Sequence, residues 1–158
     1  MQNQTTLATE TYYTGIGLHS GNDVHMVLKP APVDTGIVFV RTDVAEKPHI
    51  RAIAKNVTST LRATTVEENG YKVFTIEHLM SAFHAARIDN CIVEMDAEEP
   101  PVADGSALTF FELMQKAGIA EQNKERQEIV IDKIYRIDDD EKKRFVMVVP
   151  YDGFRVSF

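Results

Sequence analysis

The chain has 158 residues, of which 44% are hydrophobic and 26% charged; these proportions are typical of a globular domain and exclude a disordered or collagen-like chain. No apolar run approaches the roughly 20 residues of a membrane-spanning helix, and the single cysteine, Cys91, excludes an internal disulfide framework, so we expect a cytoplasmic protein without an integral membrane segment. The net charge of −7 argues against nucleic acid as a partner, because an acidic surface repels the phosphate backbone.

Strand patterns dominate the first seventy residues. Residues 24–28 alternate imperfectly and end at Pro30, and the β-branched and aromatic run within residues 36–41 predicts a second strand. Before them, three glycines within residues 15–21 predict a tight turn that exposes its backbone. Further on, Asn69-Gly70 stands between two extended segments, which is the pattern of a two-residue β-hairpin.

The hydrophobic period then changes from strand to helix. Between residues 75 and 87 the apolar side chains recur at spacings of three and four, which predicts a helix with one buried stripe. Thr75 is the expected N-cap of this helix, and Glu77 in its first turn suits the positive end of the helix dipole. Residues 91–95 predict another strand.

A second helix is expected after the Pro100-Pro101 break, with Ser106 as its N-cap and Gly118 as its C-terminal stop. Residues 128–137 and 144–149 predict two more strands around a polar turn. The expected fold is therefore α+β, with two helices packed on one face of a mixed β-sheet.

The pair Glu77-His78 is the most suggestive chemical feature. A helix N-terminus disfavours the imidazolium form, so the His78 imidazole would stay neutral and able to bind a metal. A neighbouring carboxylate could then accept a proton from water. An exposed Glu-His pair at a helix start is also compatible with a solvated turn that has no chemical role. Asp104-Gly105-Ser106 is interpreted as a turn and cap, and Cys91 as a small buried side chain.

Six segments of the chain resemble the N-terminal half of the UDP-3-O-acyl-N-acetylglucosamine deacetylases, zinc amidases that commit Gram-negative bacteria to lipid A synthesis. They are Thr14-Gly15-Ile16-Gly17-Leu18-His19-Ser20-Gly21, Leu28-Lys29-Pro30-Ala31-Pro32 with Thr35-Gly36-Ile37, Arg41-Thr42-Asp43, Thr75-Ile76-Glu77-His78-Leu79-Met80-Ser81-Ala82, Ile88-Asp89-Asn90, and Pro101-Val102-Ala103-Asp104-Gly105-Ser106-Ala107. Their order and spacing hold from about Leu7 to Phe158, so the resemblance covers nearly the whole chain.

The resemblance implies a site for Zn²⁺ that this chain supplies only in part. His78 matches a zinc ligand of the family, and Glu77 matches the general base that activates water. The family's other two zinc ligands come from a His-Lys-x-x-Asp segment, and a further histidine assists the leaving group. All three belong to a second domain that has no counterpart in this sequence, so residues 1–158 are expected to form a single N-terminal domain and to be inactive alone.

The resemblance also implies weaker assignments around the substrate, UDP-3-O-acyl-GlcNAc. Leu18 and the segment Thr60-Leu61-Arg62 match regions near the acyl passage of the family, although Leu18 is equally compatible with an ordinary turn residue. Arg62 departs from the apolar residue that other members often carry. The implied fold is that of ribosomal protein S5 domain 2, with a small inserted β-sheet around Asn69-Gly70.

The expected function is therefore hydrolysis of a linear amide in lipid A biosynthesis, with the missing C-terminal domain as partner. The alternative is a non-catalytic α+β module of the same fold that binds or regulates. Glu77-His78 discriminates between them, because a pure binding module has no need for this pair.

Overall fold

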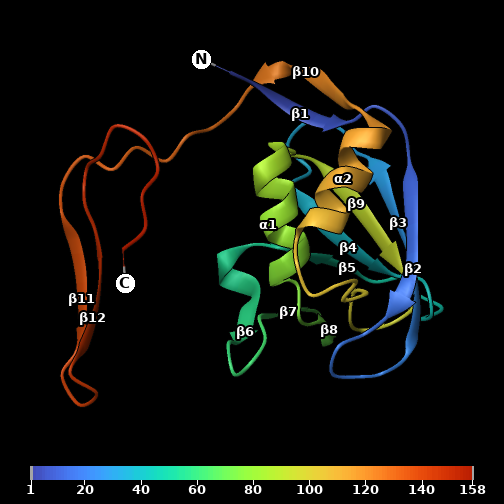
Figure 1. Ribbon diagram of the computed structural model, residues 1–158, viewed down its shortest axis with the longest axis horizontal. Helices are drawn as coiled ribbons and strands as arrows, with labels where there is room; N and C mark the ends of the chain where they lie inside the picture. Colours follow the sequence, from blue (N-terminus) through green and yellow to red (C-terminus); the bar gives the residue numbers. More distant parts are fainter. Residues whose placement is uncertain (1, 158) are drawn as a thin grey trace. The chain divides into compact units, whose positions relative to one another are not determined.

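The computed structural model describes residues 2–157 and contains two compact units, the first ending at Arg126 and the second beginning at Gln127. The first unit holds both α-helices and every residue with an expected chemical role (Figure 1). Within residues 2–157, neither helix has the length and apolar character needed to cross a membrane.

A five-stranded mixed sheet forms the framework of the first unit. Its strands are, in spatial order, β2 (Thr11–Ile16), β3 (Asp23–Pro30), β9 (Cys91–Met95), β4 (Ile37–Arg41) and β5 (His49–Arg51). β4 and β9 run parallel, and all other neighbours run antiparallel. Val24, Met26 and Leu28 are buried and alternate with more exposed residues along β3, so this strand turns one face to the core. The three predicted strands that fall in this sheet are confirmed.

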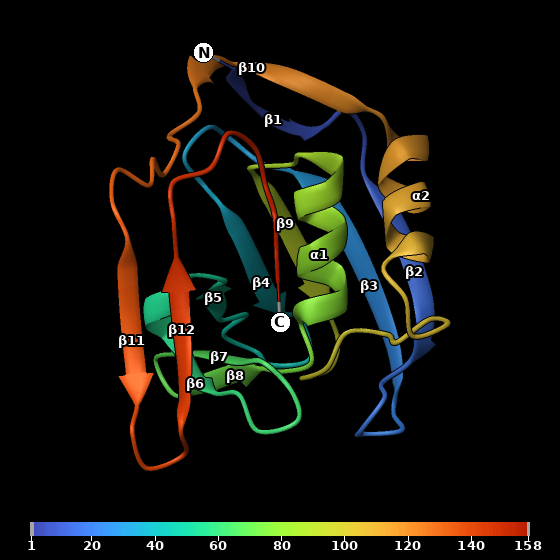
Figure 2. The ribbon, with the colours of Figure 1, turned by 60° about the vertical axis from the view of Figure 1, so that its left-hand side comes forward.

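Both helices lie on the same face of this sheet, as Figure 1 and Figure 2 show. α1 spans Glu77–Ala86 and α2 spans Leu108–Ala117. Their buried side chains form one stripe on each helix: Leu79, Ala82, Phe83 and Ala86 on α1, and Phe110, Met114 and Ala117 on α2. Gly118 ends α2 with a positive φ of 77°, as the sequence predicted. The α+β architecture is confirmed.

The pairing of β1 (Asn3–Leu7) with β10 (Ile119–Glu125) escaped the sequence analysis. β1 is polar, yet Gln4 and Thr6 are buried in it. The Gln4 side chain accepts a hydrogen bond from the Asn90 amide at 2.8 Å, and the Thr6 hydroxyl donates to the Asn90 carbonyl at 2.7 Å. Asn90 thus satisfies the polar groups that β1 buries, which explains how so polar a strand can join the core.

A small three-stranded sheet is inserted between β5 and α1, as expected. It consists of β6 (Val57–Ser59), β7 (Thr65–Glu68) and β8 (Tyr71–Val73), and follows the short 3₁₀ turn Ala54–Asn56. Glu68 pairs with Tyr71 across the predicted hairpin. Asn69 and Gly70 both have positive φ, 54° and 81°, which a two-residue type I′ turn requires.

Glu68 joins this inserted sheet to β5. Its carboxylate accepts hydrogen bonds from the Arg51 guanidinium, from the Arg51 backbone N–H at 3.0 Å and from the Asn56 amide at 3.0 Å. The Arg51 guanidinium, helped by the other two donors, lowers the pKa of Glu68 from 4.5 to about 2.

We expect the inserted sheet to loosen in acid. A carboxyl group with a depressed folded pKa stabilises the fold above its unfolded pKa, and this contribution disappears as the pH falls from about 4.5 through about 2. The measurement is urea unfolding and amide exchange of β6–β8 between pH 5 and pH 2. Glu68→Gln should remove this part of the pH dependence, and parallel losses in parent and variant would contradict the prediction.

The second unit contains one antiparallel pair, β11 (Tyr135–Asp139) and β12 (Arg144–Val148). The predicted strand over residues 128–137 is wrong in its first part, because the strand begins only at Tyr135. Ile129 and Val130 have high β-propensity but are 92% and 79% exposed, and within the described chain no strand pairs with them. Side-chain propensity alone does not make a strand without a partner.

Candidate active site

Glu77 and His78 occupy the first turn of α1, as the sequence predicted. Glu77 is exposed and His78 is half-buried. The predicted N-cap is wrong: Ile76 precedes the helix, and no side chain caps it. Thr75 instead has a φ of 57°, so the chain makes a left-handed turn there before the helix begins.

The conformation of Thr75 is unusual for its residue type. A positive φ is a genuine outlier for a β-branched residue, since its side chain crowds the backbone. Such strain costs of order 1–3 kcal/mol and clusters at functional sites. Its position directly before Ile76-Glu77-His78 therefore favours a functional role for this segment over a solvated turn.

The Glu77 carboxylate is held by the loop between β6 and β7. The backbone N–H of Thr64 donates a hydrogen bond to Oε2 of Glu77 at 3.0 Å. Among the contacts of the described residues, none engages Oε1, which leaves this oxygen available to another group. The same loop carries Thr60, Leu61 and Arg62, but within the described residues only Thr64 of this loop has a hydrogen bond to the helix start.

Leu61 and Arg62 lie on an exposed part of this loop. Leu61 is 82% exposed, and its backbone N–H donates to the Ser59 hydroxyl at 3.2 Å. Arg62 has a positive φ of 61°, which marks the point where the loop reverses. Both side chains are therefore accessible at the surface of the loop.

The glycine-rich turn that carries Leu18 and His19 is also present as predicted. The Gly17 N–H donates to the Asn22 carbonyl, and the Gly21 N–H donates to the Gly17 carbonyl, both at 3.0 Å. Leu18 is 53% exposed at this turn. Sequence reasoning missed Glu99, a fully buried carboxylate that accepts the His19 N–H at 3.0 Å. Its position in an acidic run gave no signal of burial.

The metal-binding capacity of this region is incomplete. Among residues 2–157, no three His, Cys, Asp or Glu side chains come together in a group that could hold a metal ion. The partly exposed His78 is suited to supply one ligand, and Glu77 beside it to act on a bound group. Another histidine, His25, is engaged elsewhere, with Nδ1 2.8 Å from Oδ2 of Asp96.

Asp104 and Cys91 have the structural roles that the sequence predicted, but the prediction of Ser106 as the N-cap of α2 is wrong. Asp104 accepts hydrogen bonds from the Ser106 N–H and hydroxyl, at 3.0 and 2.8 Å, and the N–H contributes most to lowering the pKa of Asp104. The Ser106 hydroxyl accepts the Leu108 N–H at 3.1 Å, although Ala107 rather than Ser106 is the N-cap residue. Burial raises the pKa of the Cys91 thiol to about 12, which makes it a poor nucleophile.

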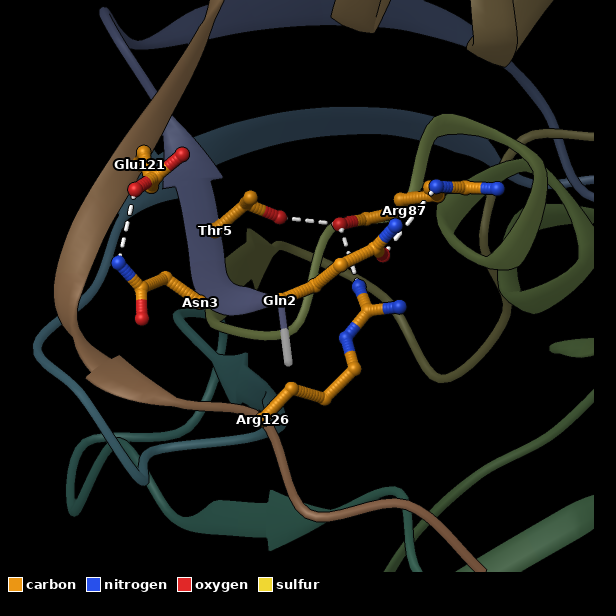
Figure 3. A pocket seen from close by; sticks show the side chains of 6 residues that line it. All are labelled: Gln2, Asn3, Thr5, Arg87, Glu121 and Arg126. Atoms are coloured by element: carbon orange, nitrogen blue, oxygen red, sulfur yellow. Dashed lines mark hydrogen bonds between the residues drawn. The ribbon is translucent and has the colours of Figure 1, made fainter.

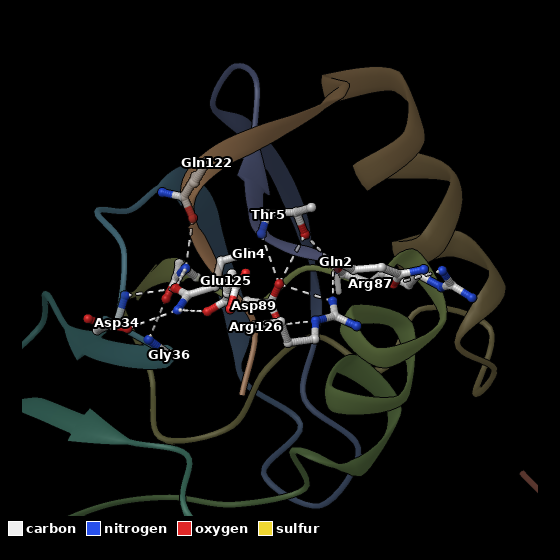
Figure 4. Close-up of polar contacts among 11 residues, drawn as sticks. Gln2, Gln4, Thr5, Asp34, Gly36, Arg87, Asp89, Gln122, Glu125 and Arg126 are labelled. Atoms are coloured by element: carbon white, nitrogen blue, oxygen red, sulfur yellow. Dashed lines mark hydrogen bonds and ion pairs between the residues drawn. The ribbon is translucent and has the colours of Figure 1, made fainter. Parts of the chain in front are cut away.

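A pocket lies at the other end of α1, away from Glu77 and His78 (Figure 3). It is lined by Gln2, Asn3, Thr5, Arg87, Glu121 and Arg126. The pocket contains two arginines, and one of them, Arg126, is neutralised by an ion pair. Arg126 binds Asp89 through Nε at 2.8 Å and Nη2 at 3.0 Å (Figure 4). The polar network in Figure 4 ties β1 to the α1–β9 turn, and none of the expected site residues lies in it.

Fold and site define an α+β protein that presents a carboxylate and an imidazole together at a helix start, a pair that metal-dependent hydrolases use. The family model for UDP-3-O-acyl N-acetylglycosamine deacetylases matches residues 4–158. The chain belongs to this family.

Curated relatives extend the match to both ends of the chain but not to their own full length. The UDP-3-O-acyl-N-acetylglucosamine deacetylases of Hahella chejuensis and Marinobacter nauticus are 48% and 47% identical over 158 residues, which is 52% and 51% of those proteins. The bifunctional enzyme LpxC/FabZ of Chlorobaculum tepidum is 44% identical over 154 residues, or 33% of its length. The chain therefore spans about half the length of the first two relatives.

Proposed function

We propose that residues 1–158 are the N-terminal domain of a two-domain, zinc-dependent amidase of Gram-negative bacteria. The complete enzyme removes acetate from the 2-acetamido group of UDP-3-O-acyl-GlcNAc in the cytoplasm, as a step of lipid A biosynthesis. The observation that carries this proposal is the exposed Glu77 beside His78, with one carboxylate oxygen held by the Thr64 N–H. The family membership and the names of the relatives support the substrate.

His78 provides one ligand for Zn²⁺ in this proposal, and the other ligands come from the second domain. Zinc, when bound, acts as a Lewis acid that polarises the amide carbonyl. Glu77 is the general base and accepts a proton from the attacking water at Oε1. The water oxygen bonds to the amide carbon, the carbon–nitrogen bond breaks, and the proton passes to the leaving nitrogen, so that acetate and a free amine are released.

The hydrogen bond from Thr64 suits this role for Glu77. It holds Oε2 at 3.0 Å and leaves Oε1 without a hydrogen bond among the described residues. A positioned base works better than a mobile one because the proton acceptor is already aligned when water attacks.

Leu18, Thr60, Leu61 and Arg62 are the proposed substrate contacts. Leu18 and Leu61 are 53% and 82% exposed, and two exposed leucines on loops tied to the helix start would suit an acyl chain. Arg62 adds a cation to this loop, and would contact a polar or anionic part of a ligand.

The second unit supports the presence of further protein. Its two-stranded sheet exposes apolar side chains, with Ile137 at 77%, Val146 at 72% and Phe145 at 54%. An isolated strand pair is at best marginally stable in water and gains stability when more strands or a helix cover it. We propose that the missing C-terminal domain packs on this unit.

The test compares the complete product of the gene that carries this sequence with the 158-residue chain. We expect the complete protein to retain one equivalent of zinc after dialysis and to release acetate from UDP-3-O-acyl-GlcNAc, because catalytic zinc sites need three protein ligands. The 158-residue chain should do neither, since a single imidazole does not form a preformed site.

His78→Ala serves as the control in both proteins. In the complete protein it should abolish zinc retention and acetate release, and it should change nothing in the 158-residue chain. A complete protein that binds the nucleotide sugar without releasing acetate would instead support the non-catalytic binding module. Zinc retained by the short chain, with turnover that His78→Ala abolishes, would contradict the expected partial site.

A further inference from the structure

Glu99 is a buried carboxylate that the proposed reaction does not use. Its side chain is 0% exposed. Both carboxylate oxygens lie 3.0 Å from the His19 backbone nitrogen, and Oε2 also accepts the Ser20 N–H at 2.8 Å. Within residues 2–157 its hydrogen-bond donors are the backbone N–H groups of His19 and Ser20, and no cation forms an ion pair with it. Burying a carboxylate is costly unless donors compensate it, so this arrangement needs a reason.

The backbone around Glu99 joins two parts of the candidate site. On one side, the Val102 N–H donates to the Ile16 carbonyl at 2.9 Å, beside the turn that carries Leu18. On the other side, the Phe74 N–H donates to the Glu98 carbonyl at 3.0 Å, two residues before Ile76 and the start of α1. Residues 98–102 thus lie between the glycine-rich turn and the segment that leads into the helix.

The Glu99 side chain holds the turn itself. It accepts hydrogen bonds from the His19 and Ser20 N–H groups, whereas the buried Thr75 hydroxyl has no hydrogen-bond partner among the described residues. Burial raises the pKa of Glu99, but the hydrogen bonds from the Ser20 and His19 N–H groups help to hold this pKa below its ordinary value. The carboxylate is therefore ionised at neutral pH, and its hydrogen bonds are of the stronger, charge-assisted kind.

Gly17 shows how closely the turn approaches this carboxylate. A Cβ atom on Gly17 would lie 2.6 Å from Oε2 of Glu99 and 2.3 Å from the Ser20 hydroxyl oxygen. Carbon and oxygen do not approach so closely without a bond, and Glu99 cannot easily move because its other contacts hold it. Glycine is needed at position 17 because there is no room for a Cβ atom.

We propose that Glu99 is a positioning residue that fixes the turn with Leu18 and His19 against the start of α1. It thereby sets the placement of these two side chains relative to Glu77 and His78. An effect of Glu99 on turnover rests on the proposed function. The link between the turn and the start of α1 does not depend on it.

The first experiment measures amide hydrogen exchange in the 158-residue chain. Glu99→Gln keeps the size of the side chain but removes its charge and turns an NH₂ group toward N–H donors. We expect exchange at His19 and Ser20 to accelerate on the order of 10- to 100-fold, the value of a hydrogen bond to a charged group. Gly17→Ala should produce the same local change. The matched control is Glu94→Gln, which loses the same charge at a surface pair with Lys29 and should leave both amides unchanged.

The second experiment measures kcat and KM of the complete protein with UDP-3-O-acyl-GlcNAc. Glu99→Gln should lower kcat/KM about 10- to 100-fold at unchanged zinc content, because a misplacement of about 1 Å has effects of this size. Glu94→Gln should stay near the parent value. A variant that loses stability but keeps its kinetic constants would show a merely structural contact and would overturn the positioning role.

The outcomes separate this proposal from the proposed function. If the parent protein releases no acetate, the proposed function fails and the exchange experiment alone decides the structural connection. Unchanged exchange at His19 and Ser20 in Glu99→Gln overturns the proposal. If neither Glu99→Gln nor Gly17→Ala folds, amide exchange in the parent protein is the test. The His19 and Ser20 amides must then exchange as slowly as those of β3 and β9. Rapid exchange of these two amides in the folded parent overturns the connection.

Discussion

Glu77→Gln in the complete protein should lower kcat by about 10²- to 10⁴-fold, the usual contribution of a positioned general base. Glutamine keeps an oxygen that can accept the Thr64 N–H, so the side chain should retain its place at the helix start. It cannot accept a proton from water. Zinc content and thermal stability should therefore stay at the parent values while turnover falls, and the measurements are metal analysis, a melting curve and steady-state kinetics.

Glu67→Gln is the matched control for this experiment. Glu67 is an exposed carboxylate on β7, in the same inserted sheet, and it pairs with Lys72 in the strand register instead of facing the helix start. The control should leave kcat within a few-fold of the parent. If Glu77→Gln also stays within a few-fold, with zinc confirmed, Glu77 has no role as the base.

Local patterns predicted the elements whose contacts are close in sequence. The Asn69-Gly70 hairpin follows from two adjacent residues that accept positive φ, and α1 follows from a stripe that a single helix displays. The Glu77-His78 pair could be found in the same way, because adjacency in sequence at a helix start is adjacency in space. Its supporting contact with Thr64 could not, since it depends on how the inserted sheet folds back.

The features that sequence reasoning missed depend on partners far along the chain. β1 pairs with a strand more than a hundred residues later, and its buried Gln4 and Thr6 find their partners in distant residues, among them Asn90, Asp34 and Ala31. Likewise, Thr75 has the residue type of a good N-cap, but its positive φ places it in a turn before the helix, and Ile76 precedes α1 instead. Tertiary structure outweighs local propensity at both places.

Three segments that carry the family resemblance therefore have structural roles. Asp89 and Asn90 hold β1, Asp104 and Ser106 form a turn before α2, and Arg41 forms a buried ion pair with Asp43. Because these segments stabilise the fold, the resemblance that they carry indicates a shared fold in addition to a shared chemistry. The segment with Glu77 and His78 forms the first turn of α1, where the candidate active site lies.

The ion pair of Arg41 leads to the second large expected effect. Arg41 is 6% exposed at the end of β4, and its Nε and Nη2 atoms donate to the two oxygens of Asp43 at 2.8 and 2.5 Å. Its Nη1 donates to the Lys72 carbonyl at 3.2 Å, which attaches the inserted sheet. Hydrogen bonding to Asp43 raises the pKa of Arg41, so the guanidinium stays charged throughout.

Asp43→Ala should destabilise the fold by about 2–3 kcal/mol. Removing one partner of a buried ion pair costs about 3–5 kcal/mol, because it leaves a charge uncompensated. The lower value is expected here since the Asp43 side chain is 32% exposed and Glu98 remains 3.4 Å from Arg41. The measurement is urea unfolding at neutral pH, and replacing Arg41 by Met as well should restore part of the loss because the buried charge is then gone.

Asp138→Ala is the control that isolates burial. Arg136 and Asp138 have the same spacing in sequence and a two-pronged contact, with Nη2 2.7 Å from Oδ1, but their side chains are 49% and 46% exposed. Exposed ion pairs contribute about 0–1 kcal/mol, so this substitution should have little effect. Equal losses in the two alanine variants would mean that burial of Arg41 adds nothing, and that the Arg41-Thr42-Asp43 segment does not hold the inserted sheet in place.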